Sequence, residues 1–147
     1  MTKGDTMIKR IDVPAIAPPA KHFSAAVEIP PGARWLRLSG QVPVNPDGSI
    51  PKGIAAQAER VWLNIFAVLK HARMSVKDLV AVTIFMPRAE DRAGFQEVRN
   101  RMLGTEKPAS TLITVSALPH PEYLVEIEAW AAKVDKKPKK KSTKRRK

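Results

Sequence analysis

Residue types narrow the chemistry that this chain can perform. Its 147 residues include no cysteine, which excludes a thiolate nucleophile, a disulfide framework and a Cys-based zinc or iron–sulfur site. The three histidines, His22, His71 and His120, are scattered along the chain and indicate no metal site. We therefore expect neither a metal nor another cofactor, and look instead to guanidinium and carboxylate groups in unusual places.

Arg99 is one such group. It lies four residues after Phe95 and next to Val98, inside or beside the apolar stripe of a predicted helix rather than opposite it. An arginine at such a place can bend its charged end to the surface or pair with a nearby acid. It can also point inward. The sequence leaves all three alternatives open.

Two carboxylates on the last predicted strand, residues 123–132, form the second group. Strand alternation puts four aliphatic residues on one face: Val125, Ile127, Ala129 and Ala131. It puts a mixed set on the other: Leu124, Glu126, Glu128 and Trp130. The mixed face suits contact with another subunit, where Glu126 can either satisfy a neighbour's arginine and backbone amides or act on a ligand.

The elements that must position these groups follow from periodicity. Strands are predicted at residues 7–13, 23–29, 35–43, 79–86, 110–118 and 123–132, and helices at 53–74 and 91–104. The length fits one hydrophobic core. We expect an α+β fold with a mixed sheet of five to six strands and two helices on one face. The other face then meets water or another subunit, and Trp130 and Leu124 favour oligomerisation.

The charge is concentrated at the end of the chain. Residues 133–147 hold ten Lys or Arg and one Asp, which is +9 of the net +12 and leaves +3 for the rest. We predict one domain over residues 1–132 and a disordered polybasic tail over 133–147. The tail either keeps the protein soluble or contacts RNA, DNA or acidic lipid. Because it has no aromatic residue, nucleic-acid binding through it would be sensitive to salt and blind to sequence.

The start of the chain has no apolar core of a signal peptide, and no later stretch approaches the length of a membrane span. We therefore expect a cytoplasmic protein without a membrane span. Met1 and Met7 are both candidate natural starts.

Several short motifs, collinear over residues 20–132, resemble the Rid (YjgF/RidA-like) family, also labelled endoribonuclease L-PSP. They are Ser39-Gly40-Gln41-Val42-Pro43, Asn45-Pro46-Asp47-Gly48, Ala56-Gln57-Ala58, Val82-Thr83-Ile84-Phe85, Pro108-Ala109 and Val125-Glu126-Ile127-Glu128-Ala129. The resemblance implies a chorismate-mutase-like fold and a homotrimer with three intersubunit clefts that take a small molecule. In the best-known members, these clefts hydrolyse enamines and imines such as 2-aminoacrylate to a 2-keto acid and ammonia.

The resemblance also implies roles for individual residues. Glu126 matches the carboxylate that positions and deprotonates the attacking water, so it is the predicted catalytic residue. The resemblance also implies that Ser39 and Gly40 line the cleft, together with Leu112 from a later segment of the chain. Phe23 stands where the family usually has Tyr, and it cannot donate a hydrogen bond.

The largest departure from the family is at the carboxylate anchor. Deaminase-competent members read Pro-Ala-Arg-Ser where this chain reads Pro108-Ala109-Ser110-Thr111. One neutral hydrogen bond from Ser110 in place of two charge-assisted ones weakens carboxylate binding by ~2–4 kcal/mol, or ~30- to 1000-fold. Little deaminase activity is therefore expected unless Arg99, which stands where the family commonly has Asn, supplies the charge.

Three function classes remain open. The chain is a variant enamine or imine hydrolase, a trimeric protein that binds a metabolite without turning it over, or a scaffold whose tail contacts RNA. Fold resemblance alone does not choose among them.

Overall fold

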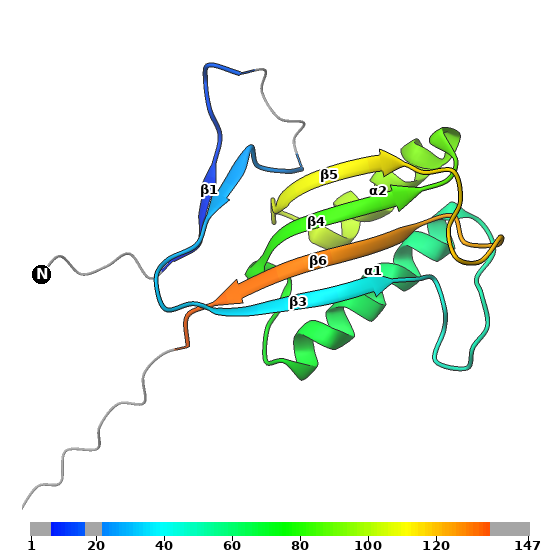
Figure 1. Cartoon of the computed structure of the whole chain (residues 1–147), viewed down its shortest axis with the longest axis horizontal. Coiled ribbons are helices and arrows are strands. Elements are labelled where there is room, and N and C mark those ends of the chain that lie inside the picture. Colours follow the sequence, from blue (N-terminus) through cyan, green and yellow to red (C-terminus); the bar gives the residue numbers. More distant parts are fainter. Residues whose placement is uncertain (1–6, 17–21, 136–147) are drawn as a thin grey trace, which may run out of the picture.

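The computed structural model describes residues 7–16 and 22–135 (Figure 1). The strands are β1 (Lys9–Ile11), β2 (Ala26–Glu28), β3 (Arg34–Gln41), β4 (Leu79–Met86), β5 (Ala109–Thr114) and β6 (Glu126–Lys133). The helices are α1 (Ile54–His71) and α2 (Arg92–Leu103), with short 3-10 turns at Val76–Asp78 and Ala89–Asp91. Every predicted element is present, with several strands shorter than predicted, and the α+β class with two helices on one face of a sheet is confirmed.

The six strands form two sheets, which corrects the expectation of one sheet of five to six strands. Four of them are ordered β3-β6-β4-β5, with β4 and β5 parallel and the other neighbours antiparallel. The remaining two, β1 and β2, pair only with each other. Pro30 and Pro31 turn the chain between β2 and β3 and lack the N–H groups that would continue a ladder. A single parallel bridge, between Ser24 and Ala109, links the β2 segment to the larger sheet.

Both helices lie behind the four-stranded sheet in Figure 1, and the core fills the layer between them. Its largest fully buried side chains include Trp62, Ile65 and Leu69 from α1, Phe95 from α2, and Ile84 and Ile127 from the sheet. On β6, the predicted alternation is confirmed. Val125, Ile127, Ala129 and Ala131 are buried under the helices, while Glu126, Glu128 and Trp130 lie on the open face.

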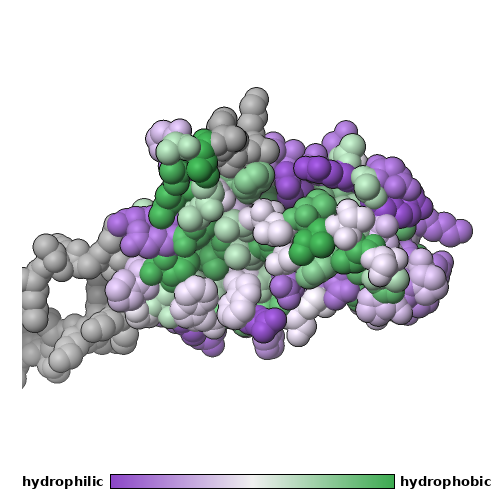
Figure 2. All heavy atoms as spheres, turned by 45° about the horizontal axis from the view of Figure 1, so that its top comes forward, coloured by the Kyte–Doolittle hydropathy of each residue, from purple (hydrophilic) through white to green (hydrophobic). Residues whose placement is uncertain are grey.

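The open face of the sheet carries exposed apolar surface. Trp35 is 54% exposed and Trp130 is 37% exposed, and the two rings meet edge to face with centroids 6.1 Å apart. They border a shallow hollow of about 520 Å³, lined by Val27, Ile29, Trp35, Val80, Ala81, Ala109 and Trp130. Figure 2 shows hydrophobic and near-neutral side chains over much of this face. Neither helix covers it.

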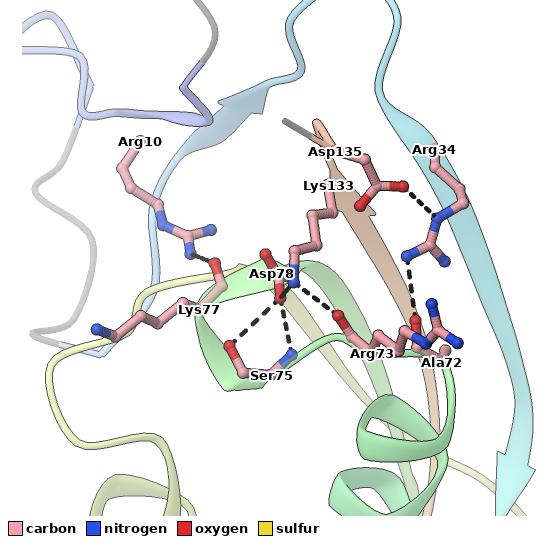
Figure 3. Close-up of polar contacts among 9 residues, drawn as sticks. All are labelled: Arg10, Arg34, Ala72, Arg73, Ser75, Lys77, Asp78, Lys133 and Asp135. Atoms are coloured by element: carbon pink, nitrogen blue, oxygen red, sulfur yellow. Dashed lines mark hydrogen bonds and ion pairs between the residues drawn. The ribbon is translucent and has the colours of Figure 1, made fainter. Parts of the chain in front are cut away.

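The C-terminal end of β6 and the start of β3 both contact the chain just after the C-terminal end of α1 (Figure 3). The Lys133 ammonium donates a hydrogen bond of 2.6 Å to the carbonyl of Arg73. The Arg34 guanidinium donates to the carbonyl of Ala72 at 3.0 Å and pairs with Asp135 at 3.1 Å. These cations satisfy carbonyls at the helix C-terminus, where positive charge is favoured. The rest of the predicted tail, residues 136–147, lies outside the described residues.

Gln57, buried on α1, fixes the loop that leads into β6. Its amide nitrogen donates to the carbonyls of Pro51 at 3.0 Å and Glu122 at 2.8 Å, while its amide oxygen accepts from the N–H of Leu124 at 2.8 Å. One side chain therefore satisfies three backbone groups next to the strand that carries Glu126. The order of this loop therefore depends on an amide at position 57.

We predict that Gln57→Glu lowers the free energy of unfolding by about 2–4 kcal/mol, because a carboxylate cannot donate to the two carbonyls and leaves them unsatisfied. Urea unfolding measures the change. The matched control is Gln41→Glu, since Gln41 makes one exposed bond, to the Ser39 carbonyl at 3.0 Å. The control should change stability by less than about 0.5 kcal/mol. Equal effects at both positions would contradict this account of Gln57.

Candidate functional site

A pocket lies between α2 and the edge strand β5. Its volume is about 330 Å³, and it is lined by Phe23, Met86, Arg88, Ala89, Arg92, Gln96, Arg99, Ser110, Leu112 and Thr114. Four of the residues predicted to bind substrate, Phe23, Arg99, Ser110 and Leu112, thus share one cavity. A concave site in which polar side chains converge beside apolar walls is suited to binding a small molecule.

The β4–α2–β5 unit explains why these side chains meet. Arg92, Gln96 and Arg99 are spaced by four and three residues on α2, so they follow one side of the helix. Ser110, Leu112 and Thr114 alternate along β5 and face the same layer as the buried Ile84 of β4. The pocket is the gap between this helix stripe and this strand face at the edge of the sheet.

Phe23 is brought to the pocket from far away in the sequence. The Ser24 hydroxyl donates to the Lys107 carbonyl at 2.8 Å, and the Ser24 N–H donates to the Pro108 carbonyl at 3.3 Å. Ser24 is buried, so these bonds fix the segment against the start of β5. The ring of Phe23 adds an apolar wall without a hydrogen-bond donor.

Arg99 is the unusual residue of the pocket. It is only 5% exposed, and among the described residues no carboxylate lies within ion-pair distance of it. Within the described part of the chain, its guanidinium donates to the Asn100 side-chain oxygen, from Nε at 3.3 Å and Nη2 at 3.2 Å. Burial, and then the positive charge of Arg92, lower the pKa of Arg99. The head of Arg99 therefore neither reaches the surface nor meets an acid of the described chain.

Arg88 and Arg92 also line the pocket, and the sequence analysis missed both. Arg88 is held by the buried carboxylate of Asp91, with contacts of 3.0 and 2.9 Å, and lies 3.4 Å from Glu90. Arg92 is exposed and has no ion pair within the described residues. The spacing of Arg92 and Gln96 before Arg99 is the signal that could have identified the stripe.

The other predicted site residues, Ser39, Gly40 and Glu126, lie elsewhere. Glu126 projects from β6 on the open face, while the pocket opens on the helix side of the sheet. A Cβ atom on Gly40 would overlap the Glu126 carboxylate. The carboxylate can occupy this position only because residue 40 has no side chain. Because β4 lies between β6 and β5, the strands that carry Glu126 and Ser110 are also about 10 Å apart across the sheet. One chain alone does not bring Glu126 to Arg99.

Over residues 7–16 and 22–135, no three His, Cys, Asp or Glu side chains gather where they could hold a metal ion. None of the helices in this part of the chain is long and apolar enough to cross a membrane.

Comparisons with known proteins agree with this architecture. A family model described as Endoribonuclease L-PSP matches residues 14–133. A solved structure of a Rid-family protein from Yersinia pestis superposes with a TM-score of 0.75 at 30% identity, covering 84% of this chain and 97% of the other. The chain belongs to the Rid family. These matches confirm the family that the short sequence motifs indicated.

Relatives of known sequence extend the comparison. A RutC family protein from Pyrococcus abyssi is 37% identical over 117 residues, which are 78% of this chain and 89% of that protein. The 2-iminobutanoate/2-iminopropanoate deaminase of Escherichia coli is 33% identical over 99 residues, which are 65% of this chain and 77% of the enzyme. This Rid-family chain is therefore similar to an imine deaminase over most of its described body.

We predict that Arg99→Met leaves the free energy of unfolding unchanged or raises it by up to about 2 kcal/mol, because the fold loses a buried charge without a counter-charge. The matched control is Arg10→Met. Arg10 donates to the Leu79 carbonyl at 2.8 Å and pairs with Glu106 at 3.1 Å, so its loss should cost about 1–3 kcal/mol. Urea unfolding compares the two. A large loss of stability in Arg99→Met would assign that arginine a structural role.

Proposed function

We propose that this Rid-family protein hydrolyses small enamines or imines that carry a carboxylate, in clefts between the subunits of a homotrimer, and that Arg99 anchors the carboxylate. The observation that carries the proposal is the buried Arg99 guanidinium, which faces the pocket beside Ser110 and has no acid partner within the described chain. A guanidinium keeps its charge at any physiological pH and recognises a carboxylate with two parallel hydrogen bonds.

The position of Arg99 explains how the family's missing arginine is replaced. Deaminase-competent relatives would carry the anchor on the strand, at the position of Ser110. In this chain, Arg99 reaches the same pocket from α2, and Ser110 leaves the room that its long side chain needs. The charge is thus supplied from the opposite wall. This revises the expectation of weak carboxylate binding that Ser110 alone would give.

The hydrolysis itself needs water and a base. Water adds to the carbon of the C=N bond while the Glu126 carboxylate accepts one of its protons. That proton passes to the nitrogen, which gives a carbinolamine. The hydroxyl proton of the carbinolamine then moves to the nitrogen as the C–N bond breaks, so ammonia leaves and a 2-keto acid remains. An enamine first becomes the imine by protonation at carbon. Atoms and charge balance without a metal or a redox cofactor.

The separation of Glu126 and Arg99 within one chain supports a cleft that is shared between subunits. The open face that carries Glu126 also carries the exposed Trp35 and Trp130 and the apolar hollow beside them. Burying this face against a second copy removes the apolar surface from water and brings Glu126 of one subunit toward the pocket of the next. Cytoplasmic location and nucleic-acid contact through residues 133–147 remain predictions from the sequence.

We predict that wild type releases 2-oxobutanoate from 2-iminobutanoate, generated in the assay by a threonine dehydratase, and that Arg99→Met lowers kcat/KM about 30- to 1000-fold. Adding Ser110→Arg to Arg99→Met should restore at least about a tenth of the activity, because it returns the charge to the same pocket from the strand. Arg101→Met is the control. Arg101 lies on the same helix, pairs with Glu59 at 3.6 Å and does not line the pocket.

Two results would contradict the proposal. Full activity in Arg99→Met would show that the carboxylate is held elsewhere. Binding of 2-oxobutanoate without any turnover by wild type would favour the second function class, a metabolite-binding protein that is not an enzyme.

Subunit complementation tests the shared cleft. We predict that Arg99→Met and Glu126→Gln are each nearly inactive, and that refolding them together in equal amounts restores about a quarter of the wild-type rate, since that fraction of clefts receives both intact residues. Light scattering should give the mass of a trimer for each variant and for the mixture. A stable monomer, or a mixture as inactive as its parts, would place both residues' roles within a single chain.

A further inference from the structure

The pocket between α2 and β5 holds more positive charge than one carboxylate requires. Three arginines line it, Arg88, Arg92 and Arg99. Arg88 is already neutralised by the buried Asp91, at 2.9 Å, and by Glu90. Arg92 and Arg99 have no carboxylate partner among the described residues. Two guanidinium groups therefore remain for a ligand.

These two groups stand at opposite ends of the pocket. Because α2 connects the parallel strands β4 and β5, it runs against the direction of β5. Arg99 is therefore level with Ser110 at the start of β5, and Arg92 is level with Thr114 at its end. The two arginines are seven positions apart on the helix, which is about 10 Å along the axis. Gln96 lies between them and can hydrogen-bond the middle of a ligand.

We propose that the pocket is built for small acids with two anionic groups, one on Arg99 and the other on Arg92. This rests on the proposed function, in which Arg99 holds the carboxylate next to the reacting carbon, and it names the substrate class: imines and enamines whose side chain ends in a second carboxylate or a phosphate. Asp91 and Glu90, which precede α2, are engaged with Arg88, and Glu126 of the neighbouring subunit serves the water.

The electrostatics of the pocket agree with a dianion. Burial, and then the positive charge of Arg92, lower the pKa of Arg99, as expected for two like charges that line one pocket. A ligand with one negative group at each end relieves this repulsion and pairs the buried charge. A monocarboxylate on Arg99 leaves Arg92 paired only with water. The second anion should therefore increase the binding affinity only moderately, because Arg92 is exposed to solvent.

Product analogues with and without a second anionic group test the inference by calorimetry. 2-Oxoglutarate and 2-oxopentanoate have the same chain length, and 3-phosphohydroxypyruvate carries a phosphate in place of the second carboxylate. We expect wild type to bind at least one of the two dianions about 10-fold or more tightly than 2-oxopentanoate. The tighter of the two identifies whether carboxylate or phosphate is preferred. Arg92→Gln should reduce this preference to about 2-fold or less.

Arg101→Gln is the matched control, since this exposed arginine lies on α2 but not in the pocket, and it should keep the full preference. Equal affinity for all three acids in wild type, or a preference that survives Arg92→Gln, would overturn the dianion inference. If 2-oxopentanoate binds through Arg99 but dianions bind no better, the proposed function stands without it. If dianions bind through both arginines but no imine is hydrolysed, the dianion-binding inference is supported and the proposed hydrolase function is rejected. Absence of binding by all three acids defeats both.

Discussion

A guanidinium cannot give up its proton inside a protein, so an arginine that is removed from water must meet an anion or carry a lasting energetic cost. Arg99 is in this position. It is almost fully buried on α2, and its guanidinium bonds to a neutral asparagine oxygen within the described chain. The surrounding structure holds it there without satisfying its charge. A ligand carboxylate would do so, and we propose that it binds in the pocket beside Ser110.

The rest of the fold places the groups around this charge. The β4–α2–β5 unit sets a stripe of polar residues on the helix against an alternating strand face, and Ser24 pins Phe23 to the start of that strand. On the opposite face, Gly40 makes room for the Glu126 carboxylate. The sheet separates these halves of the site within one chain. The same open face carries the two exposed tryptophans. In the proposed trimer, subunit association would therefore both bury this apolar surface and complete the site.

The sequence could predict the elements because their signals are local. The apolar stripe of α1, the two-sided apolar strand β4 and the alternation of β6 appear in the structure where they were expected. The separation of β1 and β2 from the main sheet was missed because it depends on proline-rich turns and long-range pairing, which periodicity does not encode. Arg88 and Arg92 were missed for a similar reason. Exposed arginines are common on helices, and only the packing of α2 on β5 shows which of them face a cavity.

A crystal structure of the protein with 2-oxopentanoate tests the central claim most directly. The account predicts that the ligand carboxylate makes two hydrogen bonds of about 2.7–2.9 Å to the Arg99 guanidinium, with Ser110 beside it. It also predicts that Glu126 from a neighbouring subunit faces the carbonyl carbon. A carboxylate bound away from Arg99, or an Arg99 already paired with a protein carboxylate in the assembly, would contradict it.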